Sequence, residues 1–98
     1  MSLSVRLQIA AECEYNAAVD WHEAEQPGLG LRFFAAVDRT IESIRTHPTR
    51  WPEELPGVRA ARVSGWPYRV FYRIGDDHVL IVAVFHTSRD PTVWQARL

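Results

Sequence analysis

The sequence has no lysine, only one cysteine and no long hydrophobic run, and the last two shortages each exclude a class of protein. A lone Cys13 cannot form an internal disulfide and leaves no cluster of thiolates for a metal. The longest wholly apolar stretch, residues 79–85, has seven residues, whereas a membrane span needs about 20. The N-terminus has no signal-peptide pattern. We therefore expect a cytoplasmic protein without a membrane span, metal or other cofactor.

The composition is that of an ordinary globular domain. Hydrophobic residues make up 47% and charged residues 23% of the 98 positions. Four Trp, four Phe and three Tyr supply large side chains for a core. Because a chain of this length has room for one core, we expect a single domain over residues 1–98.

Charge is divided unevenly between the two halves, although the net charge is only −1. Residues 1–56 carry nine acids and five arginines, net −4, whereas residues 57–98 carry three acids and six arginines, net +3. Arginine is a planar, permanent cation that suits phosphate or carboxylate, although a GC-rich genome would also explain the lack of lysine. The pattern predicts a basic face in the C-terminal half.

Hydrophobic spacing in the first half predicts one strand and two helices. Residues 3–9 alternate apolar and polar side chains, which is typical of a half-buried strand. From residue 10 the spacing changes to three and four, and the predicted buried face consists of Ala10, Cys13, Ala17, Trp21 and Ala24. After a break at Pro27-Gly28, a second helix ends before Pro48, and its predicted buried face consists of Phe34, Val37, Ile41 and Ile44.

The second half reads as a loop followed by three strands. Residues 48–57 contain three prolines and predict a loop anchored by Trp51. The strands are expected over residues 58–63, 68–74 and 79–86, and the last is apolar on both faces, which favours a central place. Asp90-Pro91 can then start one or two helical turns. The expected fold is α+β, in the order β-α-α-β-β-β, with a helical hairpin packed on a small antiparallel sheet.

Arginines dominate the candidate functional residues. Residues 68–74 place Arg69, Phe71 and Arg73 on one face, where guanidinium groups beside a ring can bind a polyanion. The alternative is that Phe71 belongs to the core under the second helix, with the arginine stems at the rim of the sheet. Arg59 and Arg62 have opposite parity, so at most one of them is expected to join Arg69; each can also be a solvated edge charge.

The loop after the last strand carries a second group of candidates. His86 can act as an acid or base near neutral pH, and Arg89 can stabilise negative charge or simply fix the turn. A triad of His86, Ser88 and Asp90 is disfavoured, because triads combine residues from separate segments and no oxyanion-hole loop is evident. The histidines of the chain lack metal-ligand spacing.

Four short motifs follow one another along nearly the whole chain, up to Trp94. They are Trp21-x4-Gln26-Pro27-Gly28-Leu29-Gly30, Pro48-x-x-Trp51-Pro52, Tyr68-Arg69-Val70-Phe71-Tyr72 and Val84-Phe85-His86-x-x-Arg89-Asp90. In their order and spacing they resemble the RelE/ParE superfamily of type II toxin–antitoxin toxins. That resemblance implies a helical hairpin on an antiparallel sheet, in agreement with the order expected above.

The resemblance also implies a function. RelE-like members cut messenger RNA on the ribosome, whereas ParE-like members poison DNA gyrase. Arg69 and Arg89 match positions of the family's site, while Trp94 stands near a tyrosine of the ribonucleases and cannot supply a phenolic proton. The His-x-x-Arg-Asp ending looks more ParE-like. A gyrase-directed toxin neutralised by a cognate antitoxin is therefore expected, with the target-binding residues Arg59, Arg62, Arg69, Arg89 and Trp94.

Two alternatives stay open at this point. The first is a ribosome-dependent endoribonuclease acting on messenger RNA, which would use Arg69, His86 and Arg89. The second is a binding domain that keeps the fold without toxicity. The chain is expected to form a homodimer or a hetero-oligomer with its antitoxin.

Overall fold

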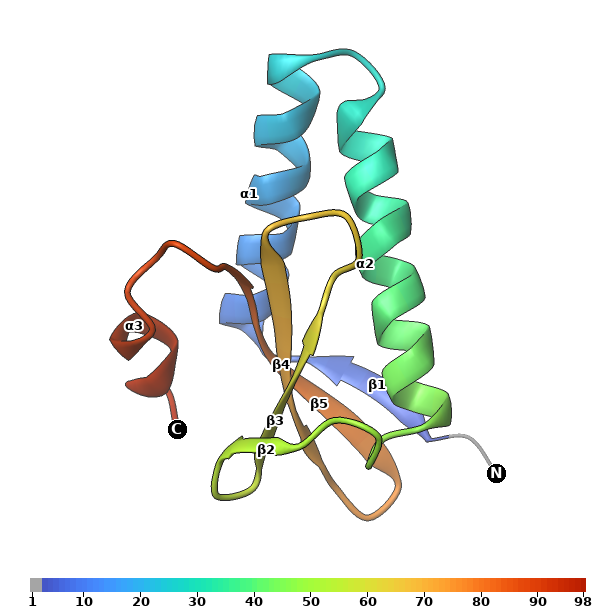
Figure 1. The fold of residues 1–98 in the computed structure, drawn as a ribbon, viewed down its shortest axis with the longest axis vertical. Helices are drawn as coiled ribbons and strands as arrows, with labels where there is room; N and C mark the ends of the chain where they lie inside the picture. Colours follow the sequence, from blue (N-terminus) through green and yellow to red (C-terminus); the bar gives the residue numbers. More distant parts are fainter. Residues whose placement is uncertain (1–2) are drawn as a thin grey trace.

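A computed structural model describes residues 3–98 of the chain. Its elements follow in the order β1 (Ser4–Leu7), α1 (Ile9–Glu25), α2 (Leu29–Thr46), β2 (Glu53–Leu55), β3 (Val58–Arg62), β4 (Tyr68–Ile74), β5 (His78–His86) and α3 (Thr92–Gln95). In Figure 1, α1 and α2 run antiparallel and extend beyond one end of the sheet, while the short α3 stands apart from them. The predicted α+β fold with a helical hairpin is confirmed.

The sheet is mixed, with the strand order β1-β5-β4-β3-β2. β1 runs parallel to β5, whereas all other neighbours are antiparallel. The expectation of a wholly antiparallel sheet is therefore wrong at β1. The chain between β1 and β5 passes through two helices and three strands, and a connection of that length can return a strand in either direction.

β2 lies within residues 48–57, which the sequence predicted as a loop. Glu53 lies opposite Arg59 across a tight turn in which Gly57 has a φ of 77°. Proline is tolerated beside an edge strand because the outer backbone groups need no partner. Because of its prolines, this segment was predicted to be a loop throughout, although it contains a short strand at the edge of the sheet.

β5 is buried on both faces and contains a bulge opposite β4. Phe71 of β4 lies opposite Ala83 and Tyr72 lies opposite Ile81, so Val82 is an extra residue on β5. An extra residue reverses the alternation of side chains. Ile81 and Val84 therefore point to one side of the sheet and Ala83 and Phe85 to the other. All five residues from Ile81 to Phe85 are buried because hydrophobic clusters cover both sides.

The buried face of α1 differs from the predicted one by a rotation of about one residue. The buried positions are Ala11, Tyr15 and His22, whereas Cys13 and Trp21 are exposed. The two large polar-tipped rings are accommodated because each finds a partner. Tyr15 donates a hydrogen bond to the carbonyl of Phe34 at 2.9 Å, and Nε2 of His22 lies 3.3 Å from the hydroxyl of Tyr68.

On α2 the predicted face is correct except at its first position. Val37, Ile41 and Ile44 are buried, but Phe33 is fully buried in place of Phe34. Phe33 lies four residues before Val37, so it continues the same stripe by one helical turn. Phe34 is 47% exposed and stacks on Tyr15 of α1, with ring centroids 5.5 Å apart.

The turn between α1 and α2 requires its glycines. Gly28 has a φ of 88°, and the Glu23 carboxylate accepts the backbone N–H groups of Gly28 and Gly30 at 2.9 and 3.0 Å. A Cβ on Gly30 would lie 2.7 Å from the carbonyl oxygen of Val19. The glycine motif therefore serves the close approach of two helices.

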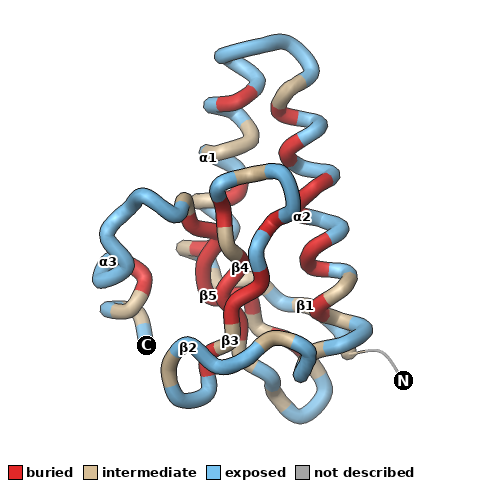
Figure 2. The backbone as a smooth tube through the Cα atoms, viewed as in Figure 1, coloured by how far each residue is buried: buried red, intermediate tan, exposed pale blue. Residues whose placement is uncertain are grey.

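The sheet separates two hydrophobic clusters. The larger lies under α1 and α2 and includes Phe33, Val70 and Tyr72. The smaller lies on the opposite face, where Phe71 packs with Phe85 and Trp94. Phe71 is therefore core, as the sequence favoured, but it lies under α3 rather than α2. Figure 2 shows the buried backbone concentrated in the central strands. Within residues 3–98, no helix is long and apolar enough to cross a membrane.

Candidate functional site

A small cavity of about 140 Å³ lies between the sheet and the loop that leads to α3. Its walls bring together four predicted site residues, Arg69, His86, Arg89 and Trp94. The remaining lining residues are Phe71, Phe85, Thr87 and Pro91. β4 and β5 pair here, so Tyr68 lies opposite His86 and Arg69 lies opposite Phe85. We call this region the α3 site.

Arg69 stands at the edge of the α3 site and is held from two sides. Its guanidinium group forms an ion pair with Glu54 on β2. It also lies over the ring of Phe71, 5.0 Å from the centroid. Because the side chains of both Arg69 and Glu54 remain about one-third or more exposed, their ion pair contributes little to stability. The guanidinium is therefore positioned without being sequestered.

Arg89 is the most accessible cation of the α3 site. Its backbone N–H donates to the carbonyl of His86 at 3.1 Å, which closes a turn directly after β5. Its guanidinium lies over Phe85, 4.4 Å from the ring centroid. Within residues 3–98 it has no carboxylate within 4.0 Å, so it does not pair with the neighbouring Asp90.

His86 has one ring nitrogen occupied. Nδ1 accepts the backbone N–H of Ser88 at 3.0 Å and lies 2.7 Å from the Ser88 hydroxyl. A backbone N–H can only donate, so the neutral ring carries its hydrogen on Nε2. Asp90 instead accepts the backbone N–H of Thr92, the first residue of α3, at 3.0 Å. The disfavoured His86-Ser88-Asp90 triad is therefore not assembled.

A row of rings connects His86 to the interior. Tyr68 meets His86 edge-on with centroids 5.0 Å apart, and its hydroxyl reaches His22. Burial raises the pKa of Tyr68, although the charge of Arg89 opposes this. Burial, and next the proximity of His86, lowers the pKa of His22. The sequence did not predict this contact, because only the register of β4 against β5 brings Tyr68 beside His86.

Trp94 is a buried anchor rather than an exposed contact residue. It is 2% exposed and stacks on Phe71 with centroids 4.1 Å apart. Its indole N–H is buried without a hydrogen-bond partner. Further along, Arg97 bonds to Glu14 of α1 at 2.5 Å and to the carbonyl of Val82 at 3.2 Å. These contacts fix α3 against the sheet.

Arg59 and Arg62 do not join the α3 site. Arg59 donates to the carbonyl of Trp51 at 2.6 Å and so fixes the loop before β2. Arg62 lies opposite Arg69 in the backbone register, but its side chain lines a cavity beside α2. The sequence predicted that at most one of the two would join Arg69, and neither lies in this cavity.

A wider groove of about 530 Å³ borders the α3 site along α1, and we call it the α1 groove. Its α1 wall includes Cys13, Ala17 and Trp21, which the sequence predicted as buried. The opposite wall contains Tyr68, Val84, His86 and Arg89. An apolar stripe is therefore exposed next to a free guanidinium. Among residues 3–98, no three His, Cys, Asp or Glu residues cluster in a way that could hold a metal ion.

Three solved structures share this fold. Over 89% of this chain and 98% of the other, the chain resembles the chromosomal ParDE toxin–antitoxin system of P. aeruginosa, with a TM-score of 0.74 and 18% identity. It resembles the RelBE2 toxin–antitoxin complex of Mycobacterium tuberculosis over 88% and 99%, with a TM-score of 0.60 and 25% identity. It resembles the YoeB dimer of Staphylococcus aureus over 88% and 99%, with a TM-score of 0.62 and 15% identity.

A family model gives the classification. No curated protein sequence matches the chain significantly. The model for the ParE toxin of the type II toxin–antitoxin system parDE matches residues 5–91, which include α1, α2, β2 to β5 and all of β1 except its first residue. The chain therefore belongs to the ParE toxin family of type II toxin–antitoxin systems.

Proposed function

We propose that this ParE-family chain is a toxin that acts on DNA gyrase and that a cognate antitoxin neutralises it. The observation that carries the proposal is the chemistry of the α3 site. The site offers guanidinium groups held over aromatic rings, at Arg69 and Arg89, but only one side chain that transfers protons near neutral pH, His86.

A ribonuclease would need more than this. Cleavage through the RNA 2′-hydroxyl requires a group that takes its proton and a second group that supplies one to the leaving oxygen. His86 can fill one of these roles through Nε2, since Nδ1 already accepts from Ser88. Trp94 is buried, and its indole N–H does not act as an acid in water. The second role therefore has no candidate in the α3 site.

A gyrase inhibitor needs a binding surface instead. Interface residues that dominate affinity are often arginines and aromatics beside well-packed cores. Arg89 fits this description, because it is exposed, has no carboxylate partner and lies against Phe85. Arg69 lies on the same side of the sheet, over Phe71. We expect both guanidinium groups to contact the target.

The test compares the two targets directly. Purified toxin is added to gyrase supercoiling and DNA-cleavage assays, and separately to a translation reaction in which messenger RNA is mapped. We expect inhibited supercoiling or trapped cleaved DNA, with intact message. Codon-periodic cleavage that disappears in His86→Ala would support the ribonuclease instead. Inactivity in both assays and normal growth on expression would support a non-toxic binding domain.

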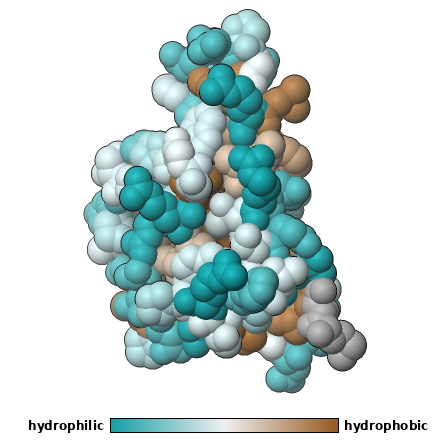
Figure 3. Space-filling model, turned by 45° about the vertical axis from the view of Figure 1, so that its right-hand side comes forward, coloured by the Kyte–Doolittle hydropathy of each residue, from teal (hydrophilic) through white to brown (hydrophobic). Residues whose placement is uncertain are grey.

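The α1 groove is the expected site for the antitoxin. Cys13, Ala17 and Trp21 form an apolar wall, and Arg89 provides a cation at the rim. An amphipathic segment can place apolar side chains along this wall and an acidic side chain against Arg89. Two of the similar structures come from systems in which toxin and antitoxin occur together. A separate hydrophobic surface lies near the tip of the helical hairpin in Figure 3, and Leu31, which is 74% exposed in the first turn of α2, lies outside the α1 groove.

Substitution at Trp21 tests this docking site. Trp21 is 60% exposed, so Trp21→Glu should leave the fold intact while it places a charge in the apolar wall. We expect co-purification with the antitoxin to be lost and growth inhibition to persist in the presence of the antitoxin. Leu31→Glu, at an exposed position outside the groove, is the control. Unchanged co-purification of Trp21→Glu would rule out this docking site.

A further inference from the structure

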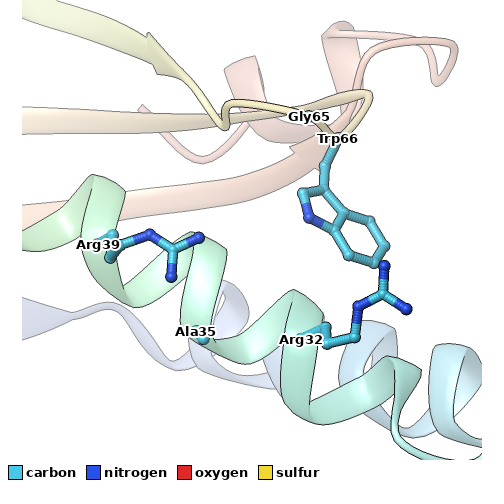
Figure 4. Close-up of a pocket in the computed structure, with 5 residues that line it drawn as sticks. All are labelled: Arg32, Ala35, Arg39, Gly65 and Trp66. Atoms are coloured by element: carbon cyan, nitrogen blue, oxygen red, sulfur yellow. The ribbon is translucent and has the colours of Figure 1, made fainter.

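A second cluster of cations lies on the opposite side of the fold, between α2 and the turn that joins β3 to β4. A cavity of about 500 Å³ is lined by Arg32, Ala35, Arg39, Gly65 and Trp66 (Figure 4). A neighbouring cavity of about 300 Å³ is lined by Ala36, Arg39, Thr40, Ser43, Trp51, Arg62 and Ser64. Arg39 lines both, so the two cavities adjoin at this side chain, and together we call them the α2 groove.

The spacing of the arginines on α2 builds one wall of this groove. Arg32 and Arg39 are seven residues apart, which places them on the same helix face about 10.5 Å from each other along the axis. Ala35 lies between them, and its small side chain leaves the space between the two arginines open. In Figure 4 the Arg32 guanidinium lies near the indole of Trp66, while the Arg39 side chain extends along α2.

The turn between β3 and β4 supplies the facing ring. The backbone N–H of Trp66 donates to the carbonyl of Val63 at 3.1 Å, with Gly65 at a φ of 84° in the third position. That geometry is typical of a type II turn and favours glycine. One side of the indole contacts Phe33 edge-on at 5.1 Å, while Trp66 as a whole stays half-buried. Part of the ring therefore faces the groove.

The α2 groove is unopposed by negative charge. No acidic side chain lines it. Asp38 lies toward α1: burial raises the pKa of Tyr15 on that helix, and the charge of Asp38 raises it further. Glu42 is paired with Arg45. Within residues 3–98, neither Arg32, Arg39 nor Arg62 has a carboxylate within 4.0 Å. The groove thus concentrates three free guanidinium groups in an otherwise slightly acidic chain.

We propose that the α2 groove binds single-stranded nucleic acid. Arg32, Arg39 and Arg62 neutralise successive backbone phosphates, and Trp66 stacks on an unpaired base. An acidic protein segment fits less well, because the floor consists of small residues and lacks the apolar pockets that anchor protein partners. The α1 groove has such an apolar wall and lies on other elements, namely α1, β4, β5 and the loop after β5.

The test measures binding of the full-length toxin to a fluorescein-labelled oligothymidylate by anisotropy over a range of salt concentrations. We expect affinity to fall with salt, since phosphate contacts release counterions. The double variant R32A/R39A should bind the oligonucleotide with an affinity lower by roughly tenfold per arginine at low salt. The slope of log affinity against log salt concentration should become shallower by about 1.4. Trp66→Phe should weaken binding by less, because a smaller ring still stacks.

The control removes the same charge elsewhere. R6A/R73A takes two arginines from outside the α2 groove and should leave both affinity and slope nearly unchanged. Equal losses of oligonucleotide affinity in the two double variants would overturn the proposal, because binding would then depend on net charge alone. It would equally be overturned if polyglutamate bound at these arginines while the oligonucleotide did not. Gyrase assays are separate readouts, so this test is independent of the proposed target.

Discussion

The two faces of the sheet are covered by different amounts of structure. The face under α1 and α2 buries Phe33, Val37 and Tyr72 completely, and rings from both helices interlock there. The opposite face is closed by a single helical turn, whose Trp94 covers Phe71. Stability is therefore concentrated on the helical face, while the thinner face carries the guanidinium groups of the α3 site. The fold and the proposed function use different sides of one sheet.

Phe33→Ala should give the largest loss of stability. Phe33 is fully buried and meets Tyr15, His22 and Tyr68, so its removal leaves a cavity that rigid neighbours cannot fill. We expect the free energy of unfolding to fall by about 4 kcal/mol. Phe34→Ala, at the exposed neighbouring position, should cost about 1 kcal/mol. Urea denaturation measures both, and similar losses would contradict the assigned face of α2.

Trp94→Ala should have a smaller effect that is confined to the thin face. We expect the free energy of unfolding to fall by about 3 kcal/mol. This value is at the lower end of the range for a buried tryptophan because α3 is only four residues long. Hydrogen exchange should show lost protection at α3 and the end of β5, with α1 and α2 still protected. Uniform loss of protection would show that the two faces unfold as one unit.

His22 should produce the smallest effect, visible as a dependence of stability on pH. The fold lowers the pKa of His22, chiefly by burial, so the unfolded chain binds this proton more readily. Stability should therefore decline as pH falls below about 6.5, the ordinary pKa of histidine. His22→Gln should flatten that decline in melts recorded between neutral and mildly acidic pH. An unchanged slope would assign it to other groups.

Much of the fold could be predicted because alternation and helical spacing are local signals. The parity of β4 is correct, with Tyr68, Val70 and Tyr72 on one face and Phe71 on the other. The buried face of α1 could not be fixed in this way. Ala10 and Cys13 form a stripe as regular as that of Ala11 and Tyr15, and only the partners on α2 and β4 decide between the two stripes.

The candidate site was predictable where strand neighbours create it. Arg69 and His86 come together because β4 pairs with β5, and Arg89 follows the same strand end. The placement of Arg59 depends on a carbonyl in the preceding loop, which no pattern in the sequence indicates. The α2 groove was missed for the same reason, since Arg32 and Trp66 meet only through the packing of α2 beside the β3–β4 turn.

The separation of fold from function is tested most directly by Arg89→Ala. Arg89 is exposed and lies over Phe85 without a carboxylate partner, so its removal should change the free energy of unfolding by no more than about 1 kcal/mol. The same purified variant is assayed for gyrase inhibition beside wild type, with Arg73→Ala as the matched control. We expect inhibition to be lost while the melting temperature and the control activity stay near wild type. Full inhibition by a folded Arg89→Ala protein would contradict the assignment of function to the α3 site.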